Sequence, residues 1–215
     1  MRSVDAGDLT TRVRIRDVAV RRFAVEGFEV PVRAIAQDAG VSAALVMHHF
    51  RSKDALRAEC DAYVLRVLRE SETESLVTAA PGQLLAELAT IEEYAPIAGY
   101  VVQALLAGGD LATAFLDRMV RDAEIYLQQA VDAGRVRPSR DPAARARYLA
   151  YLGLGGLLVH LRQSPRGTDL GAVLRSYADI FVLPGLELYT EGLFTDSSLL
   201  DTFLDQAGAP SRPET

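Results

Sequence analysis

The chain has 215 residues, and 49% of them are apolar, so it can bury the core of one large domain or two smaller ones. A formal net charge of −6 argues against a protein that coats nucleic acid without specificity, and the single cysteine, Cys60, excludes an internal disulfide. The polar start does not resemble a signal peptide, and the longest uncharged runs, 94–109 and 148–161, are too short for a membrane span. We therefore expect a cytoplasmic protein without a membrane segment.

The charge is unevenly distributed along the chain. Residues 1–53 hold nine Arg and Lys against six Asp and Glu, a balance of +3, while the remaining 14 against 23 leave −9. A basic head and an acidic body are typical of a protein that touches DNA at one end only, although surface scatter could produce the same difference.

Residues 1–9 have no periodic apolar pattern and are expected to form a flexible arm. A first helix is predicted over 11–26, because apolar residues recur there at helical spacing from Ile15 to Phe23. Five arginines share its remaining surface. Such a charge run is usually solvated, but Arg12, near the start of the helix, is a candidate phosphate contact.

Two short helices joined by a tight turn are predicted over residues 30–53. Pro31 suits the first turn of the first helix, and Gly40 suits a left-handed helix end. Ser42 is placed to cap the second helix, in which Val46 and Phe50 face inward. This is the pattern of a helix-turn-helix, whose second helix can enter a DNA major groove.

This stretch resembles the DNA-binding domain of the TetR family of transcriptional regulators. The resemblance is carried by Phe23 and Gly27, Ile35-Ala36, Ala39-Gly40-Val41-Ser42, His49-Phe50, and Lys53 with Leu56. It implies an all-α fold, with an N-terminal three-helix DNA-binding domain at 10–53, a larger helical ligand-binding and dimerisation domain at 54–207, and a loose tail at 208–215. It also implies a repressor that binds a palindromic operator in double-stranded DNA.

The candidate DNA contacts follow from this resemblance and from the outer face of the second helix. They are Arg12, Arg33, Ser42, Ala43, Ala44, Leu45, Met47, His48 and Lys53. Alanine and leucine can offer only apolar contacts to a base, whereas a histidine can hydrogen-bond to a base edge. Family members usually carry Thr or Ser at the position of Pro31 and Tyr at that of Met47, and both side chains touch phosphate, so two usual contacts are expected to be lost here.

Further helices are predicted over 53–76, 83–94, 96–107, 110–133, 142–163, 169–183 and 197–207. A break or kink is expected at Pro184-Gly185, with helical residues again over 186–193. Asp110 is expected to cap the fourth of these, and the 96–107 helix has no charge, so it should be buried or contact a ligand. No segment alternates as a strand would.

The family further implies a small-molecule effector that binds inside the body and shifts the 53–76 helix, which spreads the two DNA-binding heads. The candidate lining residues are Tyr63, Tyr100, Phe115, Met119, Tyr126 and Tyr151. Each lies on an apolar stripe and could equally belong to the ordinary core. An apolar or aromatic effector is expected.

A homodimer is expected to form through the helices 142–163 and 169–183, as in the family. The glycine-rich stretch 151–161 is apolar all round, which indicates that another backbone approaches it closely, or that the helix is buried within its own subunit. The candidate interface residues are Leu152, Gly155, Gly156, Val159, Tyr177 and Phe181.

The sequence also bears on two other functions, an enzyme and a regulator without a small-molecule ligand. An enzyme is disfavoured, because the sequence has no phosphate loop or nucleophile elbow and its acidic residues are expected on outer faces. No metal site or cofactor is expected, because the neighbours His48 and His49 point about 100° apart on a helix. A helical DNA-binding regulator that senses no small molecule stays open as an alternative.

Overall fold

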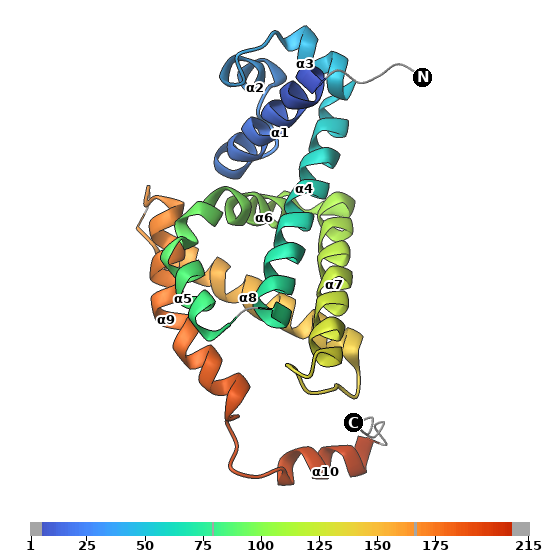
Figure 1. Ribbon diagram of the computed structural model, residues 1–215, viewed down its shortest axis with the longest axis vertical. Coiled ribbons are helices and arrows are strands. Elements are labelled where there is room, and N and C mark those ends of the chain that lie inside the picture. The colour runs from blue at the N-terminus through green and yellow to red at the C-terminus, as the bar shows by residue number, and fades with distance from the viewer. Residues whose placement is uncertain (1–5, 79, 166, 208–215) are drawn as a thin grey trace. The chain divides into compact units, whose positions relative to one another are not determined.

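The computed structural model describes residues 6–78, 80–165 and 167–207, which form helices with no strand among them, and this confirms the expected all-α fold (Figure 1). The elements are α1 Ala6–Glu26, α2 Val32–Asp38, α3 Ala43–Phe50, α4 Lys53–Thr73, the π-helix η1 Glu74–Thr78, α5 Pro81–Ala89, the 3₁₀-helix η2 Ile91–Tyr94, α6 Ala95–Ala107, α7 Gly109–Asp132, α8 Pro142–Gln163, α9 Leu170–Thr190 and α10 Ser198–Ala207. None of these helices, within the described ranges, is both long and apolar enough to cross a membrane.

Several helix ends differ from those predicted. α1 begins at Ala6, five residues before the predicted start, because apolar periodicity marks only the buried part of a helix and its first turns include the exposed Leu9. Asp110 lies in the first turn of α7 and does not cap it. The helical residues predicted from 186 belong to α9, which runs through Pro184 and ends at Thr190 and not at Leu193. Pro184 offers no N–H to the Ile180 carbonyl, a loss that is tolerated because this turn is exposed. Residues 1–5 and the predicted tail 208–215 lie outside the described residues.

The chain forms two compact units. Unit 1 comprises residues 1–72 and 93–122, and unit 2 comprises residues 73–92 and 123–215. In unit 1, α1 packs against α2, α3 and α6. The centre of this packing is Tyr100 of α6, which is 0% exposed and meets the rings of Phe23 and Phe28 edge-on at centroid distances of 6.2 and 5.3 Å. As predicted, the uncharged α6 is mostly buried.

Unit 2 is built around the second part of α7 with α8 and α9. Ala123, Leu127 and Ala146 form a small buried cluster, with Tyr126 and Leu149 packed against it. α8 and α9 are neighbours, and α9 buries Val173, Leu174 and Ala178. The predicted functional boundary at residue 53 differs from this division, which follows packing, and it stays a prediction.

Candidate nucleic-acid interface

The turn between α2 and α3 is built by two local signals. Gly40 has φ +65°, the left-handed conformation predicted for it, and the Val41 N–H donates to the Ala36 carbonyl at 3.0 Å. Ser42 then caps α3, because its hydroxyl oxygen accepts the Leu45 N–H at 3.1 Å. Both local predictions are confirmed, and together they fix the direction in which α3 leaves the turn.

α3 has one buried face and one exposed face. Val46 and Phe50 are 1% and 3% exposed and pack inward. The candidate base-reading face is exposed and comprises Ser42, Ala43, Ala44, Leu45, Met47 and His48. This outer face has the small and apolar side chains that allow a helix to approach base edges closely, with one histidine able to hydrogen-bond. Base reading by these residues stays a prediction.

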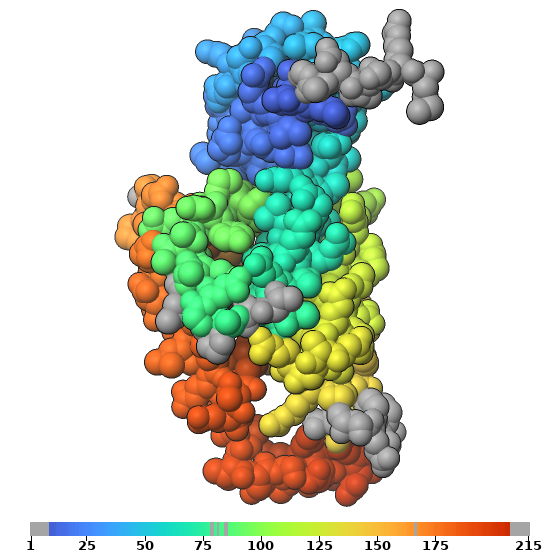
Figure 2. Space-filling view, viewed as in Figure 1, coloured from blue at the N-terminus to red at the C-terminus, as the bar shows by residue number. Residues whose placement is uncertain are grey.

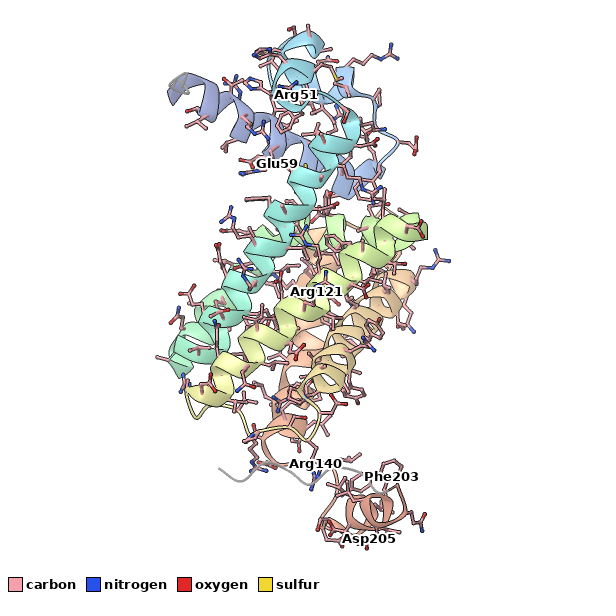
Figure 3. The ribbon with its side chains drawn as sticks, turned by 90° about the vertical axis from the view of Figure 1, so that its right-hand side faces the viewer. Arg51, Glu59, Arg121, Arg140, Phe203 and Asp205 are labelled. Carbon is pink, nitrogen blue, oxygen red and sulfur yellow. The ribbon has the colours of Figure 1, made fainter. Side chains whose placement is uncertain are left out.

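Arg12 joins three elements of unit 1. Its guanidinium donates to the His49 carbonyl at 2.6 Å and to the Glu59 carboxylate at 2.7 Å, and it lies 4.5 Å from the centre of the Phe50 ring. The last turn of α3 is therefore attached to α1 and, through Glu59, to α4 (Figure 3). The long sequence separations gave no signal for this arrangement. A phosphate contact from the same guanidinium stays a prediction.

α3 and α4 are joined by Arg51 and Ser52 alone. Arg51 has φ 64° and ψ −33°, and the Ser52 N–H donates to the Phe50 carbonyl at 2.8 Å, so Arg51 is the centre of a γ-turn (Figure 3). The Ser52 hydroxyl oxygen accepts the Ala55 N–H at 3.0 Å and so caps α4. Lys53 is half-buried in the first turn of α4, beside this junction.

α2 presents Arg33, which is exposed, and begins after Pro31, which stands at its cap position without a side-chain hydrogen bond. At its other end, Asp38 accepts a hydrogen bond from Arg22 of α1 at 2.6 Å. This bond holds the pKa of the Asp38 carboxyl below its ordinary value. The ion pair fixes α2 on α1, which is a structural role that the sequence did not indicate.

Four of the six candidate ligand-lining residues lie in unit 1. Phe115 is buried, with its ring 6.3 Å from that of Tyr100, and Met119 is half-buried. Arg16 lies 3.8 Å above the ring of Tyr63, which is half-buried. In unit 2, Tyr126 packs against the small buried cluster and Tyr151 is 50% exposed. Ligand binding by the set stays a prediction.

The Tyr100 hydroxyl has a partner that sequence reasoning missed. It donates to Asp61 of α4 at 2.6 Å and to the Arg57 carbonyl at 3.3 Å. Burial raises the pKa of the Asp61 carboxyl above its ordinary value of 3.8, although the hydrogen bond from Tyr100 acts in the opposite direction. The expectation that acidic residues lie on outer faces is wrong for Asp61, because a partner 39 residues away satisfies it inside unit 1.

The candidate dimer residues lie on α8 and α9. Leu152, Val159 and Phe181 are 44%, 58% and 42% exposed. The rings of Tyr177 and Phe181 stack at 4.4 Å, with His160 beside both.

The glycines of α8 have different surroundings. A Cβ added at Gly156 would lie 2.9 Å from the Tyr177 hydroxyl oxygen, whereas one added at Gly155 would meet nothing within 4 Å. Within its own chain, the close neighbour of Gly156 is thus the Tyr177 side chain, and the expected approach of another backbone stays a prediction. Gly155 keeps open space at its surface, so its predicted contact with a second chain is sterically allowed.

The two adjacent histidines of α3 differ in burial. His48 is exposed and His49 is half-buried, with ring centroids 5.8 Å apart. Across the described ranges, no three or more His, Cys, Asp and Glu side chains gather as a metal site would require. Cys60 is buried beneath α1, where its thiol donates to the Arg16 carbonyl at 3.8 Å, and burial raises the thiol pKa.

Comparisons with known proteins agree with this geometry. Residues 15–60 match the family model of bacterial regulatory proteins of the tetR family, and residues 92–195 match a tetracyclin repressor-like C-terminal domain. The chain is 48% identical over 202 residues to the HTH-type transcriptional regulatory protein RaaS of Mycobacterium tuberculosis, covering 94% of this chain and 95% of that protein.

Solved structures share the fold at lower identity. A putative fatty acid metabolism regulator of Clostridium perfringens has a TM-score of 0.57 at 14% identity, over 85% of this chain and 100% of its own. A putative TetR-family regulator of Rhodococcus sp. has a TM-score of 0.55 at 20% identity, over 79% and 97%. The family models and the 48% identical relative show that the chain belongs to the TetR family of transcriptional regulators.

Proposed function

We propose that this regulator binds a palindromic operator as a homodimer, represses transcription from it, and is released by a small-molecule effector. The observation that carries the proposal is the exposed outer face of α3, held from behind by Val46 and Phe50 and along its last turn by Arg12. A helix fixed in this way can present Leu45 and His48 to base edges without further ordering. Residues 10–53 are assigned to DNA binding and residues 54–207 to effector binding and dimerisation.

Dimerisation follows from what one recognition helix can read. A single α3 contacts a few base pairs, and two-fold symmetry doubles these contacts on a palindrome. The exposed apolar side chains of α8 and α9, including Leu152, Val159 and Phe181, support this pairing. Because large apolar patches are rarely left in water, a second copy is the natural cover for them.

Effector release requires two arrangements of the heads. α4 begins three residues after α3 ends, so a ligand that prefers a shifted α4 also shifts the recognition helix. A preference of roughly 100-fold for the shifted state supplies about 2.7 kcal/mol. The six candidate lining residues remain the proposed contacts for an apolar or aromatic effector. As a regulator of transcription, the protein is proposed to act in the cytoplasm and to have no catalytic activity.

The test is to select fragments from a genomic DNA pool with the purified protein and to determine its mass by light scattering. We expect a dimer, and fragments that share a two-fold-symmetric site protected at two successive major grooves. A monomer, or binding that bulk DNA always removes, contradicts the proposal. Genes beside the recovered site then give compound classes to test for release, and repression is checked with a reporter carrying the site.

A further inference from the structure

The last part of the chain exposes an unusual amount of apolar surface. We define the C-terminal arm as residues 183–207, which comprises the end of α9, the connection that follows it, and α10. Apart from the half-buried Gly185 and Leu204, each arm residue whose burial is described is exposed. The exposed large apolar side chains are Leu183, Leu186, Leu188, Tyr189, Leu193, Phe194, Leu199, Leu200 and Phe203, at 43–75% of their full surface. In Figure 2 the arm extends from the orange end of α9 to red α10.

α10 has the two faces of a docking helix. Leu199, Leu200 and Phe203 recur at i, i+1 and i+4 and share one side, while Asp201 and Asp205 occupy the other. Phe203 and Asp205 leave the helix on opposite sides (Figure 3). An isolated helix of ten residues is marginal in water, so its apolar face is expected to gain its stability from packing.

The charge of the arm identifies a complementary surface. The arm contains five acidic residues, Glu187, Glu191, Asp196, Asp201 and Asp205, and no Arg or Lys. By contrast, residues 135–147 contain five arginines and one aspartate. Immediately after them on α8, Tyr148, Tyr151 and Leu152 are 64%, 50% and 44% exposed at helical spacing. This surface combines a basic segment with exposed apolar side chains. Its charge is opposite to that of the arm, and both surfaces expose large apolar side chains.

The position of this surface favours a second copy as the occupant. Leu152 belongs both to it and to the proposed dimer interface, so the two apolar areas are continuous on α8. In its own chain, the arm leaves Phe203 and Leu199 65% and 64% exposed, so they are not packed against their own α8. A stable dimer buries about 800 Å² on each partner, and nine large side chains supply a substantial part of such an area.

We propose that the C-terminal arm of each subunit crosses to the other copy and packs the apolar face of α10 on the partner's α8, around Tyr148 and Leu152 of the partner subunit. Acidic residues of the arm at the edge of this contact then lie near the partner's arginine-rich segment 135–147. This inference rests on the proposed homodimer and adds to it a second contact, made by α10 with the first half of the partner's α8, that links the two chains reciprocally.

Disulfide trapping in the full-length protein tests the exchange. Cys60 is 0% exposed, so introduced cysteines are the reactive thiols. A Phe203→Cys chain and a Tyr148→Cys chain carrying a tag of different mass are co-expressed and mildly oxidised. We expect a mixed disulfide-linked dimer. The matched control is Asp205→Cys, which places the thiol on the opposite side of α10 and should link to the Tyr148→Cys chain much less.

The outcomes separate the arm from the dimer itself. Arm exchange is overturned if the cysteines at positions 203 and 205 form the mixed disulfide equally well. It is also overturned if neither forms it while light scattering still shows a dimer. Both outcomes leave the proposed function intact. A disulfide formed only within one chain that carries both cysteines also overturns it, because the arm then folds on its own subunit. A monomer in light scattering overturns both proposals. Independently, Phe203→Glu should raise the dimer dissociation constant by about tenfold or more at unchanged helix content, and an unchanged constant counts against the arm.

Discussion

The two compact units differ in how much of their apolar surface one chain can bury. Of the ten largest fully buried side chains among the described residues, nine lie in unit 1 and Val173 alone lies in unit 2. Unit 2 instead exposes large apolar side chains along α8, α9 and α10. Unit 1 thus has a core complete in a single chain, whereas the core of unit 2 is completed, in our proposal, by a second copy.

The largest effect expected from this comparison is on stability. Ile35→Ala removes a side chain of α2 that is 0% exposed in unit 1, and should lower the free energy of unfolding by about 2 to 5 kcal/mol in urea denaturation. Ile125→Ala makes the same chemical change at a side chain 48% exposed in unit 2, and should cost within about 0.5 kcal/mol. Equal losses of unfolding free energy would show that the two units do not differ in how well a single chain buries their apolar side chains.

A second prediction concerns base preference, which should depend on unit 1 alone. His48→Ala should reduce discrimination at a single base pair of the operator by about 1 to 3 kcal/mol, because it removes one hydrogen-bonding group from the outer face of α3. Binding to a set of singly substituted operators measures this. His160→Ala, the same substitution in unit 2, should leave base preference unchanged. A uniform loss of affinity for all operators would show that His48 does not contact a base.

A substitution of Arg12 should have a smaller effect, and it distinguishes a role in positioning α3 from a contact with DNA phosphate. If Arg12 positions α3, Arg12→Gln should cost about 1 kcal/mol of stability, because the Glu59 pair is partly exposed, and should leave the salt dependence of DNA binding nearly unchanged. Lys53→Ala should instead weaken binding about equally for all sequences and reduce the salt slope by about 1. A slope change as large for Arg12 as for Lys53, at unchanged stability, would identify Arg12 as a phosphate contact.

The smallest expected effect is the pH dependence from Asp61. Its pKa is raised in the folded state, so its contribution to stability is fully present below 3.8 and is lost as pH rises through the raised value. Asp61→Asn stays neutral and can still accept the Tyr100 hydrogen bond. The variant should therefore gain stability relative to the parent as pH rises above 3.8.

Asp38→Asn is the control with the opposite sign. The pKa of Asp38 is lowered, so this variant should lose stability relative to the parent above the ordinary carboxyl pKa. Thermal unfolding across pH measures both differences. Parallel curves for the two variants would contradict the opposite directions of the two pKa shifts.

The helix-turn-helix was predictable because its signals act over a few residues. The turn at Gly40 and the caps at Ser42 and Ser52 each depend on neighbours within four positions. Helix periodicity likewise gave the order of the helices, but not their exposed ends, such as the first turns of α1. The fold class therefore followed from local patterns and from the family resemblance together.

Long-range contacts could not be predicted in this way. Arg12 meets Glu59 across 47 residues and Tyr100 meets Asp61 across 39, and no periodicity links such pairs. The glycines of α8 signalled a close neighbour, but the sequence could not tell that Gly156 admits Tyr177 of the same chain. A tyrosine on an apolar stripe does not by itself indicate a ligand site, because a buried hydroxyl such as that of Tyr100 can find its partner within the protein.

The γ-turn at Arg51 has a mechanical consequence. A non-glycine residue with positive φ carries a conformational cost, which a longer linker would avoid. With this strained residue, two residues suffice to connect α3 to α4, and the connection is short and rigid. A rotation of α4 about its axis should therefore also rotate the last turn of α3. Inserting a single flexible residue after Arg51 should remove this coupling.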